Sequence, residues 1–409
     1  MRRSYLRLLG GVLFSLPLLF ASCGNGDNAL EEIIKNGGSG GSGEGGGSST
    51  INATAITLSQ TMKVIKLGGD ALTITATVTP SDATYTWESS DEAIATVENG
   101  VVTPVGKGIA TITAKSGDVK ATCEVFVGKV VNLSTKTENY TVAEYDILIG
   151  ALNSSNSITI PDNCKVAFAG VTTASSITCS GNATIILVDG NENTVSAAAN
   201  EAGIKIGGDG TTLTINAETL GNGILNVTGG SYGGAGIGTA ATGVSNSVGG
   251  DITINGGKIT ATGNLGGAGI GTGYARGGYT NKCGKITIKG GEVTATGGTN
   301  GAGIGTGYAD GDAGTTKNEC GDITINGGTV IAKGDQNAAG IGTGCAFKNT
   351  GGTAVEQKCG AIMITADVTS VTAIRGASCY VSIGTGNLNG TGSQSCGTIT
   401  IDPSANVVY

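Results

Sequence analysis

Four cysteines recur in the second half of the chain, each followed by glycine and each just ahead of an Ile-rich segment: Cys283, Cys320, Cys359 and Cys396. Four thiolates could hold zinc or an iron–sulfur cluster if they converged on one point. If they stack on successive coils instead, the column spans roughly 14 Å, too far for bonds of about 2.3 Å to one metal.

Neighbouring thiols in such a column could form disulfides, because adjacent strands lie about 4.8 Å apart and disulfides accept Cα separations of about 4.4–6.8 Å. They could also stay reduced and act as small buried apolar side chains. Nine cysteines remain when Cys23 is set aside, and this odd number favours at least one free thiol. We expect the reduced packing column.

Two tyrosines are the best candidates for ligand binding. Tyr274 and Tyr308 each follow a Gly-Thr-Gly run, and Arg276 and Asp310 stand two residues further on. Stacked on one edge, the rings could cover sugar faces while the charged neighbours bond to hydroxyl groups. The same two rings could equally serve only to cover the edge of the coil.

One acidic cluster could bind a metal. Asp310, Asp312 and Glu319 lie close together in the sequence and could supply oxygen ligands to a weakly held calcium ion, although the EF-hand spacing is absent. We predict no other cofactor.

Catalysis is not expected. The chain contains no His, which removes the commonest general base and the His-dependent nucleophile arrangements. Glycoside hydrolysis would still need two carboxylates converging across a groove, and a lyase would need a Lys or Arg base. We therefore predict a protein that is not an enzyme, with a β-helical polysaccharide lyase or hydrolase as the alternative.

The elements that position these residues repeat. An Ile-x-Ile segment begins at Ile252, Ile286, Ile323, Ile362 and Ile399, with periods of 34, 37, 39 and 37 residues. Each is followed by a turn at Gly or a neighbouring residue and a second short strand, and in most repeats by a Gly-Ile-Gly-Thr run. Units of this size cannot bury an apolar face alone and must stack.

The strands of one repeat predict how the side chains point. Ile252 and Ile254 should face inward and Thr253 outward, because strand side chains alternate. Gly269–Gly271 should form a third thin strand, and 274–282 a loop. Three short strands and a loop per repeat are typical of a parallel β-helix, whereas a propeller blade needs four longer antiparallel strands.

Stacking also explains other repeated residues. Asp251, Lys285 and Asp322 should share one column, and Lys258 should pair with Glu292 to fix the register. An outward threonine column is predicted at Thr253, Thr287, Thr324 and Thr400. Such a regular face could bind ice, but Met363 interrupts the column.

Composition agrees with this architecture. The 409 residues include 75 Gly and only 5 Pro, and the net charge is −8 with 13% charged residues. The glycines recur among β-branched residues and indicate turns and close packing. A basic footprint is absent, so nucleic acid is not expected as a partner.

Residues 51–128 differ from the repeats. They contain longer alternating segments at 72–78, 109–114 and 123–127, separated by turn signals, which predict a small β-sandwich around one buried Trp. This region resembles the group 2 bacterial Ig-like domain, and the resemblance implies a spacer or an adhesive module. The residues that carry it are Trp87, Ser89, Ser90, Ala95, Val97, Gly100, Val102, Gly108, Thr111, Ile112 and Ala114.

Residues 180–409 are also similar to the Gly-rich coil domains of bacterial surface proteins of the adhesin or carbohydrate-binding type. That resemblance implies a glycan as ligand. It covers the repeats as a whole and singles out no residue.

The N-terminus predicts where in the cell the protein is located. Three arginines precede an apolar segment at 8–20, which is too short to span a membrane, and Ala21-Ser22-Cys23 follows. This resembles a bacterial lipoprotein signal, which implies lipidation of Cys23 and anchoring in the outer membrane, facing the cell surface. An ordinary secretory peptide is the alternative.

These features predict an all-β protein: a small Ig-like β-sandwich followed by a right-handed parallel β-helix with about five regular coils. The predicted parts are a signal peptide (1–22), a lipidated Cys with a Gly/Ser-rich tether (23–50), the sandwich (51–128) and the β-helix (129–409), irregular over 129–229 and regular over 230–409. The predicted function is non-catalytic binding of a polysaccharide or a cell-surface glycan; a purely structural spacer is the second alternative.

Overall fold

The computed structural model describes residues 51–409 except 220, 244, 313 and 349–353. Thr50–Tyr409 form one compact unit. In the described residues, the secondary structure consists of β-strands and one 3-10 helix, Leu133–Thr135. None of the described helices is long and apolar enough to cross a membrane.

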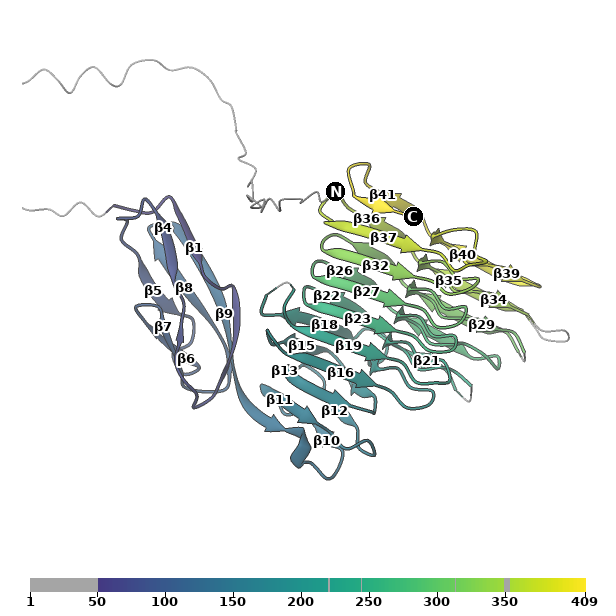
Figure 1. The fold of residues 1–409 in the computed structure, drawn as a ribbon, viewed down its shortest axis with the longest axis horizontal. Helices are drawn as coiled ribbons and strands as arrows, with labels where there is room; N and C mark the ends of the chain where they lie inside the picture. Colours follow the sequence, from purple (N-terminus) through teal and green to yellow (C-terminus); the bar gives the residue numbers. More distant parts are fainter. Residues whose placement is uncertain (1–50, 220, 244, 313, 349–353) are drawn as a thin grey trace, which may run out of the picture. The chain divides into compact units, whose positions relative to one another are not determined.

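The first part is a β-sandwich (Figure 1). Strands β1 and β4 pair antiparallel, β3, β7 and β6 form a second sheet, and β2, β9, β8 and β5 form a third. The bounds are β1 (Ala55–Leu58), β2 (Met62–Lys66), β3 (Leu72–Thr73), β4 (Ala76–Thr79), β5 (Thr86–Ser89), β6 (Ala95–Glu98), β7 (Val101–Pro104), β8 (Gly108–Ser116) and β9 (Val119–Asn132).

Two expectations for the sandwich were wrong in detail. The alternating segment 72–78 is not one strand: it divides into β3 and β4, which belong to different sheets. Trp87 is half-buried and not enclosed, and it packs between two small apolar clusters while its ring contacts that of Tyr85 edge-on at 6.0 Å between centroids.

Strand β9 belongs to both parts of the chain. Its residues 119–128 pair with β8 and β2 in the sandwich, and its residues 129–132 pair in parallel with β11 (Asp146–Ala151), a strand of the coil stack. Phe126 and Ile147 lie in one apolar cluster with side chains from both parts, and the Phe126 and Tyr145 rings are 5.6 Å apart. The sandwich and the coils therefore share a strand and a small core.

From β10 (Tyr140–Thr141) onward the chain forms a parallel β-helix, drawn from blue through teal and green to yellow in Figure 1. Three walls of in-register parallel strands enclose the core. The first wall contains β11 (Asp146–Ala151), β13 (Cys164–Thr173), β15 (Ala183–Leu187), β18 (Thr212–Ala217), β22 (Asp251–Ile254), β26 (Ile286–Ile288), β31 (Ile323–Ile325), β36 (Ile362–Ile364) and β41 (Ile399–Ile401).

The second wall contains β16 (Glu192–Ser196), β19 (Ile224–Thr228), β23 (Lys258–Thr262), β27 (Glu292–Thr296), β32 (Thr329–Lys333), β37 (Ser370–Ile374) and β42 (Val407–Val408). The third contains β10 (Tyr140–Thr141), β12 (Ile158–Ile160), β14 (Ile177–Cys179), β17 (Ile204–Lys205), β20 (Ile237–Gly238), β24 (Ile270–Gly271), β28 (Ile304–Gly305), β33 (Ile341–Gly342) and β38 (Ile383–Gly384).

The five regular coils follow the predicted register. Ile252 pairs with Ile286, and the pairing continues through the remaining Ile-x-Ile strands. Ile252 and Ile254 are fully buried, as the alternation predicted. Burial of each such side chain stabilises the folded state by roughly 1.5–3 kcal/mol. The irregular segment 129–229 adds further strands to the same walls.

One predicted loop is partly a strand. Within 274–282, residues from Thr280 onward form β25, part of an additional parallel sheet at one corner of the coils. That sheet contains β21 (Ser247–Val248), β25 (Thr280–Cys283), β30 (Thr316–Cys320), β35 (Val355–Cys359) and β40 (Gly392–Cys396). A smaller sheet joins β29 (Ala309–Asp310), β34 (Ala346–Phe347) and β39 (Leu388–Asn389). Parts of the segments between the walls therefore form stacked parallel strands as well.

The second glycine of each Gly-Ile-Gly run is required by its backbone. Gly271 has φ 134°, a value that L-residues avoid, and a Cβ built there would overlap the carbonyl oxygen of Gly305 on the next coil. The same relation holds between Gly305 and Gly342. A side chain larger than that of glycine therefore does not fit along this column.

A ladder of four amide side chains, three of them buried, runs beside the glycines. Asn281, Asn318, Gln357 and Gln394 occupy one register position on β25, β30, β35 and β40. Each amide bonds to a threonine of a Gly-Ile-Gly-Thr run; Thr272, for example, donates its hydroxyl to Asn318. Each of these threonine hydroxyls also accepts a backbone N–H from the next coil. The recurring threonine therefore joins neighbouring coils.

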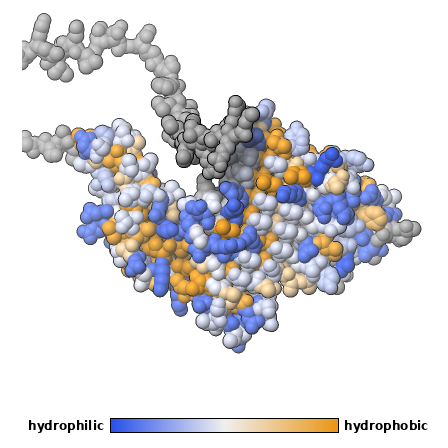
Figure 2. Space-filling view, in the orientation of Figure 1, coloured by the Kyte–Doolittle hydropathy of each residue, from blue (hydrophilic) through white to orange (hydrophobic). Residues whose placement is uncertain are grey.

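Apolar side chains reach the surface at the last coils (Figure 2). Ile399, Val408 and Tyr409 are 43%, 61% and 74% exposed, whereas the Ile residues equivalent to Ile399 in the preceding coils are fully buried. The last strands have a coil on one side only in this chain.

Candidate functional site

A groove lies along the corner where the sheet of β25, β30, β35 and β40 turns into the first wall. Its volume is about 550 Å³, and it extends over four coils. The four Cys-Gly pairs line it, and small residues at this corner leave the groove open. The surrounding side chains are charged and of both signs: Asp209, Asp251, Lys282, Lys285, Glu319 and Lys358.

The charges along the groove form alternating columns. Lys282, Glu319 and Lys358 stand at one register position on successive strands. Lys282 also forms an ion pair with Asp209 at 2.9 Å. Hydrogen bonding to Lys282 lowers the pKa of the Asp209 carboxyl, and the same contact raises the pKa of Lys282. The rim of the groove thus offers hydrogen-bonding groups of both signs. The side chains of Cys283, Cys320 and Cys359, by contrast, pack in the apolar core of the coils.

The cysteines form the predicted column. Cys283, Cys320, Cys359 and Cys396 pair in register, and all four are free thiols. The first three are at most 5% exposed and the fourth is half-buried. The thiol of Cys283 contacts the carbonyl oxygen of Gly250 at 3.7 Å, a contact that Cys320 repeats with Gly284 at 3.9 Å.

The structure brings the two predicted tyrosines together. The rings of Tyr274 and Tyr308 stack with centroids 5.1 Å apart and planes 15° from parallel. The guanidinium of Arg276 lies over the Tyr274 ring at 5.6 Å, and the Tyr274 hydroxyl donates to Asp310 at 3.2 Å. The four predicted residues are therefore one cluster.

The cluster is already closely packed. Tyr274 is only 9% exposed, and burial, followed by the charge of Asp310, raises its pKa. Burial also raises the pKa of the Asp310 carboxyl, although the hydrogen bond from Tyr274 opposes this shift. Neither tyrosine lines the groove. The rings contact the protein's own side chains, and Tyr308, which is half-buried, has the more accessible ring.

The three acidic residues suggested for calcium do not converge. Asp310 bonds to Tyr274, Asp312 accepts the backbone N–H of Gly277 at 2.9 Å, and Glu319 lines the groove. Across the described part of the chain, no group of three or more Cys, Asp or Glu side chains is arranged to hold a metal ion. Cys23, the predicted lipidation site, lies outside the described residues.

Sequence reasoning found the cysteine column but not the groove that it lines. The charged columns were interpreted as register pairs, and Lys258 and Glu292 do form one at 3.5 Å. The signal that could have revealed the groove is the Cys-Gly dipeptide itself, because two small residues repeated at one corner leave room above them.

Comparisons with known proteins identify both parts of the chain. Residues 52–126 match the family described as bacterial Ig-like domain (group 2). Residues 252–274, 286–308 and 323–345 each match a β-helix repeat. Over 149 residues, 34% of this chain, the sequence is 34% identical to a protein of Bifidobacterium longum subsp. longum named alpha-L-arabinofuranosidase. The matched stretch covers 13% of that protein.

Proposed function

We propose that this chain is a cell-surface lipoprotein that binds a glycan through its β-helix without cleaving it, with the Ig-like domain as a spacer. The observation that carries the proposal is the groove over four coils, whose rim offers Lys and carboxylate groups to sugar hydroxyls. The partial similarity to a protein named as an arabinofuranosidase supports a glycan as the ligand class.

The groove is the first candidate for the glycan position because it is concave and open. The cluster of Tyr274, Arg276, Tyr308 and Asp310 is the second, because the ring of Tyr308 could still stack on a sugar. The two positions are separate, so variants can distinguish them.

The test is retention of the full-length chain, in detergent, on affinity gels containing plant, host or microbial polysaccharides. We expect the double variant Lys282→Ala/Lys358→Ala to lose retention by at least about tenfold, equivalent to about 1.4 kcal/mol. The matched control is Lys258→Ala/Lys289→Ala, which removes the same charge from exposed positions outside the groove. The control should bind like the parent.

Other outcomes would change the proposal. Loss only in Tyr274→Ala/Tyr308→Ala would move the site to the tyrosines, provided that this variant keeps the parent's unfolding midpoint. Absence of retention on every polysaccharide would favour the structural spacer.

Hydrolysis is the second candidate function, because Asp209, Asp251 and Glu319 line the same groove. A general acid needs a raised pKa, whereas the pKa of Asp209 is lowered by Lys282, and Asp251 already accepts the backbone N–H of Lys285 at 2.7 Å. Release of reducing sugar that disappears in Glu319→Gln would establish a hydrolase and overturn the non-catalytic proposal.

The lipid anchor has its own test. Metabolic labelling with a radioactive fatty acid should mark the parent chain and not Cys23→Ser. Accessibility of the labelled protein to protease added to intact cells would then decide whether it faces the cell surface. Equal labelling of parent and variant would contradict lipidation at this cysteine.

A further inference from the structure

The charges beside the groove are grouped by coil. On one coil, Lys282 and Lys285 line the groove before and after a Cys-Gly pair. Glu319 and Asp322 stand at the same two positions on the next coil, because β25 pairs in register with β30, and β26 with β31. Lys358 follows on the third coil, at the position of Lys282 and Glu319. A ligand lying along the groove therefore meets a positive coil, a negative coil and again a positive coil.

Two of the lysines are available to a ligand. Lys285 and Lys358 are exposed, and neither forms an ion pair with another described residue. Two carboxylates of the same corner already accept hydrogen bonds. Asp251 accepts the backbone N–H of Lys285 at 2.7 Å, and Asp322 accepts the backbone N–H of Ala361 at 2.9 Å. The ammonium groups of both lysines can therefore bind an anionic group of a ligand.

The middle coil has the opposite preference. Glu319 is half-buried, lines the groove and lies in register between Lys282 and Lys358. A carboxylate accepts hydrogen bonds from hydroxyl or amide N–H groups, and it repels a second carboxylate placed beside it. Glu319 therefore favours a neutral sugar at this coil and disfavours an acidic one.

The spacing of the positive coils fits alternate sugars. These coils are two strand spacings apart, about 9.6 Å. One sugar unit in an extended polysaccharide is roughly as long as one strand spacing, so consecutive sugars would lie beside consecutive coils. An acidic group on every second sugar would then reach both positive coils, and the neutral sugar between would face Glu319.

We propose that the groove binds a linear acidic polysaccharide that carries a carboxylate on every second sugar. The lysines of the two positive coils bind the carboxylates, and Glu319 accepts a hydrogen bond from the neutral sugar between them. This inference rests on the proposed glycan binding and names its ligand class. Because the charges lie at an exposed groove, added salt weakens the attraction.

The experiment compares matched polymers, using the full-length chain in detergent. Hyaluronan and unsulfated chondroitin carry a carboxylate on alternate sugars, their carboxyl-reduced forms carry none, and polygalacturonate carries one on every sugar. On affinity gels at low salt, retention by an alternating polymer should be at least about tenfold greater than by its carboxyl-reduced form or by polygalacturonate. Added salt should reduce this difference.

A charge reversal tests the role of the middle coil. Glu319→Lys makes three successive coils positive, so retention on polygalacturonate should increase by roughly fivefold or more. The matched control is Glu292→Lys, which makes the same change of charge at an exposed position outside the groove. The control should be retained like the parent on every polymer.

The outcomes separate this inference from the proposed function. Equal retention by an alternating polymer and its carboxyl-reduced form would overturn the acidic ligand and leave glycan binding in place. Stronger retention of the parent chain by polygalacturonate would overturn the alternation. Retention only by a neutral polysaccharide would overturn this inference alone, whereas no retention by any polysaccharide would overturn the proposed function as well. The comparison on the parent chain decides the outcome even if Glu319→Lys fails to fold.

Discussion

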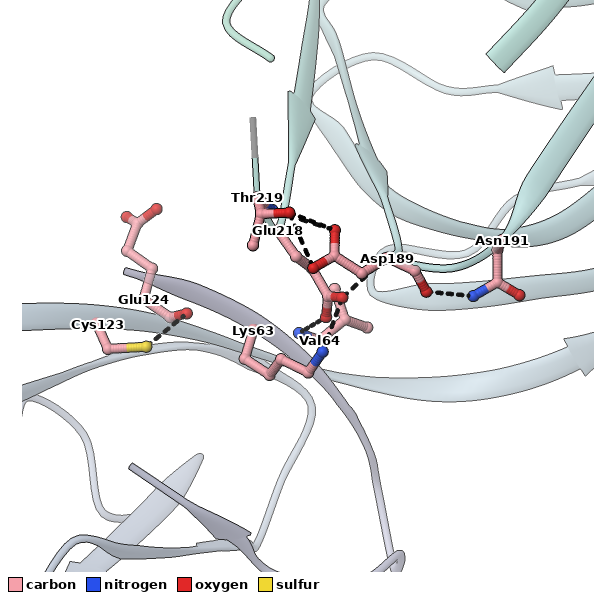
Figure 3. Close-up of polar contacts among 8 residues, drawn as sticks. All are labelled: Lys63, Val64, Cys123, Glu124, Asp189, Asn191, Glu218 and Thr219. Carbon is pink, nitrogen blue, oxygen red and sulfur yellow. Dashed lines mark hydrogen bonds and ion pairs between the residues drawn. The ribbon is translucent and has the colours of Figure 1, made fainter. Parts of the chain in front are cut away.

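The carboxylate of Glu218 accepts the backbone N–H of Val64 at 2.6 Å, although 154 residues separate the two positions in the chain. It also accepts the backbone N–H of Asp189 at 2.9 Å and forms an ion pair with Lys63 at 2.9 Å (Figure 3). Its side chain is only 1% exposed. One buried carboxylate thus bonds to both the sandwich and the β-helix.

Glu218→Ala should weaken this junction. The substitution leaves two backbone N–H groups without their acceptor and removes the partner of Lys63, so we expect a loss of about 2–4 kcal/mol in the free energy of unfolding. Urea denaturation measures the loss. The control is Glu124→Ala, an exposed glutamate on β9, which should change stability by less than about 0.5 kcal/mol. Similar effects in both variants would contradict the role of Glu218.

Asn318→Ala should destabilise the coils. The Asn318 amide donates to the carbonyl oxygens of Gly307 and Tyr308 and accepts the Thr272 hydroxyl, all in the interior. Leaving these groups unpaired should cost about 2–4 kcal/mol in unfolding free energy. Thr324→Ala, an outward threonine in the same coil, is the matched control and should be close to neutral. A neutral Asn318→Ala would show that water replaces the amide.

The glycine column predicts a graded series. Gly271→Ala should reduce the unfolding free energy by at least about 2 kcal/mol, because the new methyl group overlaps Gly305 and the backbone is strained. Gly384→Ala has the same strained φ but meets no atom closer than 3.5 Å, so it should cost less. Gly208→Ala has open space around it and should be neutral. Thermal unfolding midpoints should follow this order.

Cys396 should react with iodoacetamide at lower pH than an ordinary thiol. The hydrogen bond from Cys359 lowers the pKa of Cys396, and the same contact raises the pKa of Cys359. Since only the thiolate reacts, a lower pKa makes Cys396 reactive at a pH where unperturbed thiols are still protonated. Alkylation rates over a pH series, read by mass spectrometry, give the midpoint.

Cys359→Ala provides the comparison for this titration. Without the donor, the midpoint of Cys396 should move up. An unchanged midpoint in this variant would show that the hydrogen bond is not the cause.

The periodic part of the fold was predictable because stacking repeats each local rule. The Ile-x-Ile strands gave both the register and the inward face, and this held for Ile252 through Ile325. The buried amides carry a signal that was overlooked: each stands two residues before a groove cysteine, as Asn318 does before Cys320. The signal was overlooked because a polar residue inside an alternating segment is usually taken to indicate a loop.

The non-periodic features could not be read in this way. Glu218 occurs once, and its partners Lys63 and Val64 lie in another domain, so neither spacing nor composition connects them. The groove forms because the residues along one corner of the coils are small. The packing of Tyr274 depends on its contacts with Arg276 and Tyr308. Such outcomes follow from three-dimensional packing and not from the order of residue types.

The in-register columns also restrict how the length of this protein can change during evolution. A duplication or deletion of one whole coil would preserve every amide, glycine and cysteine contact with its neighbours, whereas an insertion of any other length in a wall would put them out of phase. Related chains should therefore differ in length by whole coils, and the groove should lengthen or shorten with them in steps of about 4.8 Å.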